Sequence, residues 1–76
     1  MTLFQMVDAL MWRSNRWMTE RDVRGGLRAM FAVKVGRAEL RRFFYSEQIA
    51  FQHHKGHYRL NDEARLERLV SELMAA

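Results

Sequence analysis

The first pattern along the chain is a run of apolar residues at helical spacing. Its members are Leu3, Phe4, Met6, Val7, Leu10 and Met11. Recurrence every three or four residues is typical of one face of a helix, and Thr2 and Gln5 have the spacing of a capping box. We therefore expect a helix over residues 3–13, which ends where Ser14 and Asn15 favour a turn.

A second helix is predicted after a very short strand at residues 17–18. Thr19 and Asp22 indicate its start, because a hydroxyl caps the first turn and an acid suits the positive end of the helix dipole. Its inner face is predicted from the apolar residues Val23, Leu27, Met30 and Phe31. Gly25 and Gly26 lie inside this helix, and each costs up to about 1 kcal/mol relative to alanine. Either the helix bends there or a neighbour packs very close.

A third helix is expected from about Lys34 to Gln48, with one apolar and one basic face. Its inner stripe consists of Gly36, Leu40, Phe43, Phe44 and Glu47. At about 100° per residue, the opposite face carries Lys34, Ala38, Arg41, Arg42 and Tyr45, with Arg37 at its edge.

The stretch "IAFQHHKGHYRLN" alternates apolar and polar residues around a glycine, which predicts a β-hairpin over about 49–60. Gly56 supplies the positive φ that a tight turn needs. The residues expected to anchor the hairpin to the core are Ile49, Phe51, Tyr58 and Leu60. Asp62 is the expected cap of a last helix, whose apolar side carries Leu66, Leu69, Val70, Leu73 and Met74. That side either covers the core or pairs with a second copy.

These elements predict one α+β domain over residues 1–76, mainly helical with a small β-hairpin. The order α-(β)-α-α-β-β-α is that of a winged helix-turn-helix domain. In such domains the second helix of the pair enters the major groove of DNA, and the helix before it is held against the backbone.

Two segments carry a resemblance to known regulators. In "MFAVKVGRAELRRFF", Phe31, Val33 and Ala38 match the helix-turn-helix pattern that holds two helices together. The segment "DALMWRSNRWMTERDV" resembles the start of bacterial CaiF/GrlA-type transcriptional regulators. The chain also resembles the wider set of small winged-helix regulators, and the whole similarity covers roughly residues 3–50. The sequence is therefore interpreted as that of a small regulator from a bacterium, a phage or a mobile element. The resemblance implies transcriptional control through binding to double-stranded DNA.

The charge distribution favours an anionic partner. Residues 13–59 carry 11 Lys and Arg against four acids, a net charge of +7, whereas the two ends carry two against five, a net charge of −3. The chain has no cysteine, which excludes disulfides and thiolate metal sites. It also has no apolar run of about 18 residues or more, and its N-terminus does not resemble a signal peptide. We therefore expect a cytoplasmic, nucleoid-associated protein.

Arginine pairs with guanine in the major groove, and lysine or arginine neutralises phosphate. The third predicted helix is the expected recognition helix, and its candidate DNA contacts are Lys34, Arg37, Arg41, Arg42 and Tyr45. The predicted β-hairpin is the wing of this fold, and its candidate DNA contacts are His54, Lys55, His57 and Arg59. The second predicted helix carries three candidate contacts to the DNA backbone, Arg21, Arg24 and Arg28. Histidines gain positive charge as the pH falls toward about 6, which predicts tighter DNA binding in mild acid.

Other functions are less well supported by the residues. His53 and His54 are adjacent and point to opposite faces of a strand, whereas structural zinc needs four convergent ligands. We expect no metal, no cofactor and no enzymatic activity, since no serine stands near a His–acid pair. Two alternatives stay open: a protein-interaction module on the same fold, such as a phage inhibitor, and an RNA-binding protein. A homodimer through the N- and C-terminal helices is also expected, because two-fold pairing doubles the base contacts.

Overall fold

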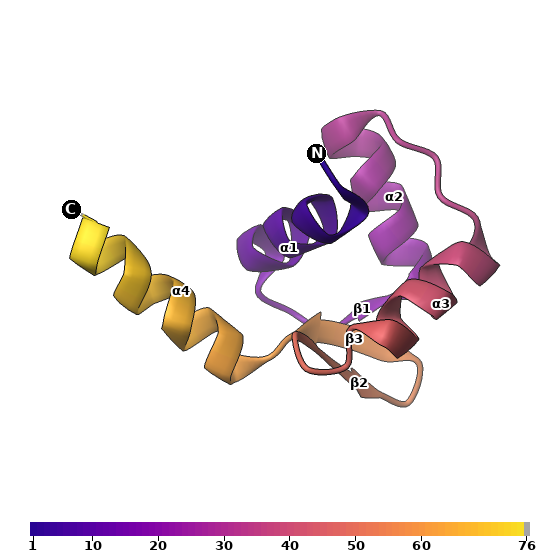
Figure 1. The fold of residues 1–76 in the computed structure, drawn as a ribbon. Helices are drawn as coiled ribbons and strands as arrows, with labels where there is room; N and C mark the ends of the chain where they lie inside the picture. The colour runs from indigo at the N-terminus through magenta and orange to yellow at the C-terminus, as the bar shows by residue number, and fades with distance from the viewer. Residues whose placement is uncertain (76) are drawn as a thin grey trace.

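The computed structural model describes residues 1–75 and shows a mainly helical chain with a small antiparallel sheet. Its elements are α1 (Leu3–Ser14), β1 (Met18–Thr19), α2 (Glu20–Phe31), α3 (Arg37–Ser46), β2 (Phe51–His54), β3 (His57–Leu60) and α4 (Asp62–Ala75). The central strand, β3, pairs antiparallel with β1 on one side and β2 on the other. In Figure 1, α1, α2 and α3 gather above the sheet, and α4 extends away from them. The predicted α+β class is confirmed.

The first two helices begin with capping boxes, one at the predicted box of Thr2 and Gln5 and the other at Thr19, which the sequence predicts as a helix start. The Thr2 hydroxyl accepts a hydrogen bond from the Gln5 amide at 3.1 Å, and the Gln5 side chain accepts one from the Thr2 amide at 2.8 Å. Thr19 and Asp22 make the same exchange at 3.1 Å in both directions. Each box satisfies amide groups that a helix start otherwise leaves unpaired. The starting residues of α1 and α2 are therefore defined by local sequence.

The core is apolar and draws on every element except α4. Its buried residues are Met6, Val7, Leu10, Met11, Met18, Val23, Leu27, Val35, Leu40, Phe44, Phe51, Tyr58 and Leu60. Within residues 1–75, no charged side chain is buried. Burial of these apolar side chains is the main force that holds the helices on the sheet.

Aromatic packing joins α3 to the hairpin formed by β2 and β3. The Phe44 ring is stacked on the Tyr58 ring, with centres 3.9 Å apart and 11° between their planes. Phe44 also meets Phe51 edge-on at 5.6 Å, and Phe43 lies 5.7 Å from Phe51. Aromatic pairs in these geometries stabilise a core beyond the burial of their area. Because Phe43 and Phe44 occupy the inner side of α3, these contacts determine which side of the helix faces outward.

The two glycines inside α2 have different surroundings. A β-carbon on Gly26 would lie 2.7 and 2.8 Å from the two methyl carbons of Leu10, whereas one on Gly25 would meet nothing within 4 Å. Helix α1 therefore packs very close to α2 at Gly26. Of the two explanations that the sequence left open, close packing is the one found at this residue.

The third helix is shorter than predicted. It spans Arg37–Ser46 rather than 34–48. Val35 is buried at 5% exposure, and Gly36 ahead of the helix is extended, so the chain turns inward before the helix begins. Lys34 consequently belongs to the connection between α2 and α3 and not to α3.

Two apolar residues, Ile49 and Met30, are more exposed than their patterns predict, and Ala38 is exposed as the periodicity of the third helix predicts. Ile49 is 93% exposed, because a turn with two hydrogen bonds to the Glu47 carbonyl carries it outward. Ile49 therefore does not anchor the hairpin, and β2 begins at Phe51. Met30, near the end of α2, is 38% exposed. Ala38 is exposed on the outer side of α3, so it does not hold the helix pair together as the helix-turn-helix pattern implied.

Helix α4 does not cover the core. Its cap is Asn61 rather than Asp62, because the Asn61 side chain accepts a hydrogen bond from the Glu63 amide at 3.0 Å. All five residues of its predicted apolar stripe are exposed: Leu66, Leu69, Val70, Leu73 and Met74. We name these five residues the α4 stripe. Within residues 1–75, no helix combines the length and the apolar character needed to cross a membrane.

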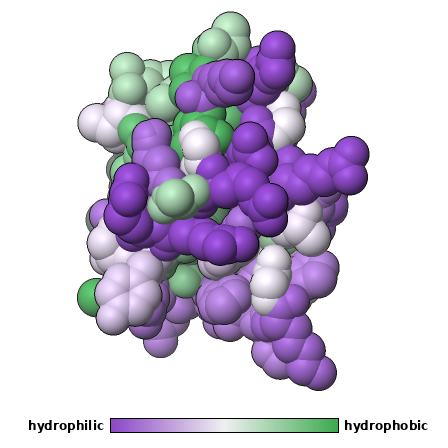
Figure 2. Space-filling model, turned by 90° about the vertical axis from the view of Figure 1, so that its right-hand side faces the viewer, coloured by the Kyte–Doolittle hydropathy of each residue, from purple (hydrophilic) through white to green (hydrophobic). Residues whose placement is uncertain are grey.

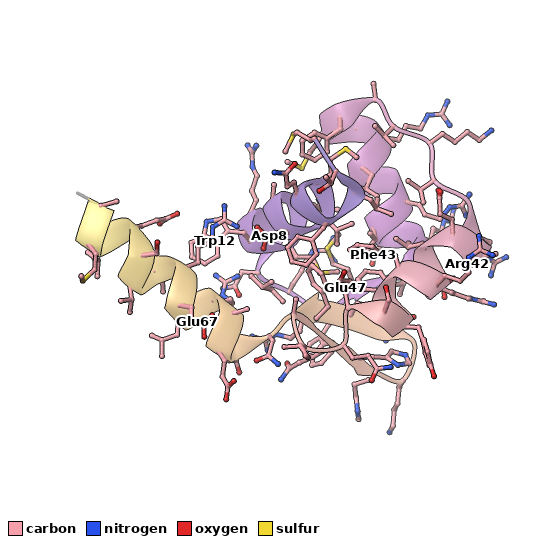
Figure 3. All side chains as sticks on the ribbon, viewed as in Figure 1. Asp8, Trp12, Arg42, Phe43, Glu47 and Glu67 are labelled. Carbon is pink, nitrogen blue, oxygen red and sulfur yellow. The ribbon has the colours of Figure 1, made fainter. Side chains whose placement is uncertain are left out.

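The side of α4 that meets α1 is polar. Arg68 donates a hydrogen bond to the Asp8 carboxylate at 2.7 Å. The guanidinium groups of Arg65 and Arg68 both lie 4.6 Å from the centre of the Trp12 ring, where the ring face attracts cations. Figure 3 labels Asp8 and Trp12 on the part of α1 that is nearest α4. These polar contacts leave the α4 stripe directed away from the core.

The glycine pair in α2 provides a test of the α1–α2 contact. We expect Gly25→Ala to stabilise the fold by about 0.5–1 kcal/mol, because alanine favours the helix and has open space there. Gly26→Ala is expected to destabilise it, because crowding a packed core typically costs about 1–3 kcal/mol. Urea unfolding of the two variants measures both effects. Equal stabilisation by both substitutions would contradict the close packing of Leu10 on Gly26.

The capping box of α2 predicts a pH-dependent contribution to stability. The hydrogen bond from the Thr19 amide, aided by Arg16 at 3.7 Å, lowers the pKa of Asp22 below its ordinary value of 3.8. The carboxylate therefore stabilises the fold at pH values above about 4, and this contribution is lost as the pH falls through the lowered pKa.

We expect Asp22→Asn to be less stable than the wild type at neutral pH, and the difference to vanish in strong acid. Urea unfolding at pH values from about 7 to about 2 measures the difference. Glu63→Gln is the control, since it removes an exposed acid at another helix start where the structure shows no such box. If the difference in stability between Asp22→Asn and the wild type stayed constant into strong acid, the ionised Asp22 carboxylate would not be the stabilising group.

Candidate nucleic-acid interface

The side of α3 that faces away from the core is basic. Leu40 and Phe44 point into the core, and helical periodicity turns Arg41 and Arg42 outward. We name as the α3 face its exposed basic and tyrosine residues, Arg37, Arg41, Arg42 and Tyr45. Figure 3 labels Arg42 on the side of α3 that is away from α1. Four of the five residues predicted for the recognition helix thus share one helix surface.

The fifth of these residues, Lys34, lines a small hollow beside α2. We name as the α2 basic cluster the four basic residues around it, Arg21, Arg24, Arg28 and Lys34. Arg24 Nε donates a hydrogen bond to the Val35 carbonyl at 3.0 Å, which ties α2 to the connection. Within residues 1–75, no carboxylate forms an ion pair with Arg21, Arg28 or Lys34. Their charge is therefore not neutralised by a direct partner.

The α3 face and the α2 basic cluster lie on adjoining parts of the surface. Helices α2 and α3 are in contact, and the connection that holds Lys34 joins them. Figure 2 views the molecule from the side where this connection and α3 lie, and strongly hydrophilic side chains cover much of that face. Cations gathered on one side of a small domain create a field that attracts polyanions.

One acid, Glu20 at the start of α2, contacts the α3 face. Arg41 Nε donates a hydrogen bond to Glu20 Oε1 at 2.7 Å, and Arg37 Nε lies 4.0 Å from Glu20 Oε2. The Glu20 side chain is only 18% exposed, whereas those of Arg37 and Arg41 are 69% and 61% exposed. The hydrogen bond to Glu20 raises the pKa of Arg41 above its already high value, so this guanidinium stays charged.

The predicted wing residues occupy two different environments. Lys55 and Gly56 form the turn with φ values of 47° and 77°, and His54 and His57 flank it as an exposed cross-strand pair. Arg59 lies farther from the tip and pairs with Asp62 at 2.9 Å. Its guanidinium also lies 5.5 Å from the centre of the Trp17 ring. Three of the four predicted residues are thus at the hairpin tip, and Arg59 is held near its base.

An open groove of about 780 Å³ lies between α3 and the hairpin. Arg41 and Tyr45 line it from the helix, and Gln52, His53 and His54 line it from the edge strand β2. Cationic, aromatic and amide side chains therefore meet along one depression. Such side chains can bond phosphate oxygens or the edges of bases.

The prediction of wing contacts missed His53 and Trp17. The His53 ring is stacked on Tyr58, with centres 4.7 Å apart, and burial raises the pKa of the Tyr58 hydroxyl, which stays protonated. Trp17 is 38% exposed and also lines the groove. Strand alternation could have indicated His53, because it lies two residues after the buried Phe51 and so on the same side of β2. No local pattern indicated that Trp17 would lie near the hairpin.

The exposed side chains of this surface are mainly hydrogen-bond donors, which suit an anionic ligand. They are mainly guanidinium, ammonium and imidazole side chains, which donate hydrogen bonds to phosphate and to base acceptors. Within residues 1–75, no three His, Cys, Asp or Glu side chains gather in a way that could hold a metal ion. Comparison with known proteins gives no match to a family model, a curated protein or a solved structure.

Proposed function

We propose that this chain is a DNA-binding transcriptional regulator with a winged helix-turn-helix architecture. The observation that carries the proposal is the α3 face, which lies beside the unpaired cations of the α2 basic cluster. The order of the elements supports the architecture, and the stacking of Phe44 on Tyr58 sets the hairpin beside α3. The resemblance of residues 3–50 to CaiF/GrlA-type regulators points to the same function.

In this proposal, α3 lies in the major groove of duplex DNA. Its 10 residues give a length of about 15 Å, and a helix fits the major groove, which is about 12 Å wide. Arg37, Arg41 and Arg42 project from the exposed side, and arginine is the side chain that most often reads guanine. Tyr45 is 79% exposed at the far end of the helix, where its hydroxyl can donate to a phosphate.

The α2 basic cluster and the hairpin tip supply the contacts to the DNA backbone. Cations that neutralise phosphates release counterions, and this term gives affinity that falls steeply with salt. Arg21, Arg28 and Lys34 suit this role because no acid pairs with them in the described residues. Lys55 and the two flanking histidines extend the same surface at the hairpin tip. Arg59 contributes by holding the base of the hairpin through Asp62.

Matched arginine substitutions test this proposal. Arg42→Gln is expected to weaken binding to duplex DNA by about tenfold. It is also expected to lower the slope of log affinity against log salt concentration by about one, the value for one lost phosphate contact. Arg13→Gln removes the same charge at the end of α1 nearest α4, away from α3, and is expected to change affinity by less than about twofold. Fluorescence anisotropy of a labelled duplex at several salt concentrations measures both.

Competition experiments separate duplex DNA from the alternatives. Unlabelled duplex is expected to displace the probe more effectively than single-stranded DNA or RNA of the same length. Stronger competition by RNA would favour the RNA-binding alternative. Unmeasurable binding at low salt would refute the DNA proposal and favour a protein-interaction module. Equal effects of Arg42→Gln and Arg13→Gln would refute the role of the α3 face in that binding.

A homodimer through the α4 stripe belongs to the same proposal. Four apolar residues of α1 are buried in the core and Phe4 is 38% exposed, so α4 offers the larger apolar surface of the two terminal helices. The exposed parts of the α4 stripe amount to about three whole side chains. Burying these parts in two copies would contribute roughly 9–18 kcal/mol of favourable free energy. The loss of translational and rotational freedom on association costs roughly 4–15 kcal/mol. The occupant that fits is a second copy, since the same apolar surface on both partners suits a two-fold contact.

The dimer is tested by adding a charge on or off the α4 stripe. Leu73→Glu places a carboxylate on the stripe and is expected to leave a monomer, because a buried unpaired charge is strongly unfavourable. Ser71→Glu adds the same charge at an exposed position of α4 that lies off the stripe and is expected to keep the dimer. Sedimentation velocity over a range of protein concentrations measures the association. A monomeric wild type at the highest concentrations would refute the dimer.

A further inference from the structure

The carboxylate of Glu20 bridges two arginines of the α3 face. Arg37 and Arg41 are four residues apart and are therefore neighbours on one side of the helix. Each approaches a different oxygen, with Arg41 Nε 2.7 Å from Oε1 and Arg37 Nε 4.0 Å from Oε2. Glu20 belongs to α2, so the contact crosses from one helix to the next. One acid thus holds Arg41 by a hydrogen bond and lies within ion-pair distance of Arg37.

Both contacts use the Nε atom, which leaves the far end of each guanidinium available. Within residues 1–75, the terminal nitrogens of Arg41 have no hydrogen-bond acceptor. Those two nitrogens form the fork that donates to O6 and N7 of a guanine. The side chains of Arg37 and Arg41 remain more than half exposed, so the fork can reach a base while Nε stays bonded to Glu20.

Glu20 is itself held in place by its surroundings. It is the first residue of α2 and follows the capping residue Thr19, whose strand β1 pairs with β3. A carboxylate at this position is favoured by the positive end of the helix dipole, and the side chain is only 18% exposed. The acid is therefore a fixed point against which the arginines are ordered before DNA arrives. Ordering a side chain in advance lowers the entropy lost on binding.

The same acid weakens the general attraction of the surface for DNA, because its negative charge lies beside cations that neutralise phosphate. Ion pairs between exposed side chains contribute little to folding stability, so stability alone does not account for the arrangement. We propose that Glu20 is a positioning residue that orients Arg37 and Arg41 toward guanine bases and thereby sets the sequence selectivity of the α3 face. This inference rests on the proposed DNA-binding function and adds its selectivity determinant.

Arg42 provides a contrast within the same helix. It is exposed, and within residues 1–75 no acid pairs with it. Its guanidinium is free to follow the nearest phosphate, which favours affinity without selectivity. Within residues 1–75, the α3 face therefore holds one arginine that is hydrogen-bonded to Glu20, a second within ion-pair distance of it, and a third with no acid partner.

The test uses two variants of Glu20 and a matched control. Glu20→Ala removes both acceptor oxygens and one negative charge, whereas Glu20→Gln removes the charge and keeps one acceptor. Glu39→Gln removes one exposed negative charge from α3 itself, and within residues 1–75 Glu39 pairs with neither arginine. Preferred sites are first selected with the wild type from a pool of random duplexes. Dissociation constants are then measured for the selected duplex and for a shuffled one.

A positioning role predicts opposite changes in two measured quantities. All three variants are expected to bind the shuffled duplex about two- to threefold more tightly, since each loses one negative charge near the phosphates. The preference for the selected duplex is expected to fall by about tenfold in Glu20→Ala, by less in Glu20→Gln, and not at all in Glu39→Gln. In the wild type, 7-deazaguanine in the selected site is expected to lower affinity, because it lacks the N7 acceptor. In Glu20→Ala this loss is expected to be smaller.

The outcomes separate the inference from the function on which it rests. If the wild type prefers a site and Glu20→Ala prefers it equally, the positioning role is overturned and DNA binding stands. Weaker binding of Glu20→Ala and Glu20→Gln to both duplexes, at unchanged melting temperature, also overturns the role. If Glu20→Ala does not fold, the test rests on Glu20→Gln. A reduced preference for the selected duplex in this variant supports the positioning role, and an unchanged preference overturns it. If the wild type binds no duplex at low salt, the proposed function fails and the positioning role fails with it.

Discussion

The stacking of Phe44 on Tyr58 is the contact on which the candidate binding surface depends. It joins the inner side of α3 to the central strand at a ring separation of 3.9 Å, and Phe51 closes the cluster from the neighbouring strand. A rotation of α3 by one residue, about 100°, would move Phe44 away from Tyr58 and would bring Glu39 or Arg41 into the buried place of Leu40. The orientation of the arginines is therefore a consequence of aromatic packing on the opposite side of the helix. The same contact places His53, stacked on Tyr58, opposite the end of α3.

The features that could be predicted from the sequence are those determined by neighbours in the chain. The capping boxes at Thr2 and Thr19 need only residues three positions apart. The turn at Gly56 needs only a residue that tolerates positive φ. The errors arose where tertiary contacts override the local pattern. Val35 is drawn into the core and delays the start of α3, and the turn after α3 carries Ile49 into solvent.

The candidate site shows the same division. Helical periodicity placed Arg41 and Arg42 correctly on one exposed surface, because that side of α3 follows from its inner apolar positions. Periodicity could not indicate that Glu20 would lie beside Arg41, since the two residues are 21 positions apart in the chain. The same limit applies to α4, where hydrophobic spacing predicts an apolar stripe but not its direction. Contacts of Arg68 with Asp8 and Trp12 hold the polar side of α4 against α1.

Because of such contacts, net charge is a poor measure of how this chain would meet a polyanion. The formal charge is +4, yet its arginines fall into three chemical situations. Arg68 is committed to an internal acid and an aromatic ring, Arg41 shares its Nε with Glu20 while its far end stays free, and Arg28 has no ion-pair partner among residues 1–75. Only the last kind adds its full charge to long-range attraction, which is screened by salt. An arginine of the second kind, such as Arg41, attracts a polyanion less strongly because an acid is beside it, but its side chain has a defined direction. In the proposed function, a surface that combines both kinds would attract any duplex and still distinguish between sequences, because affinity and direction reside in different side chains.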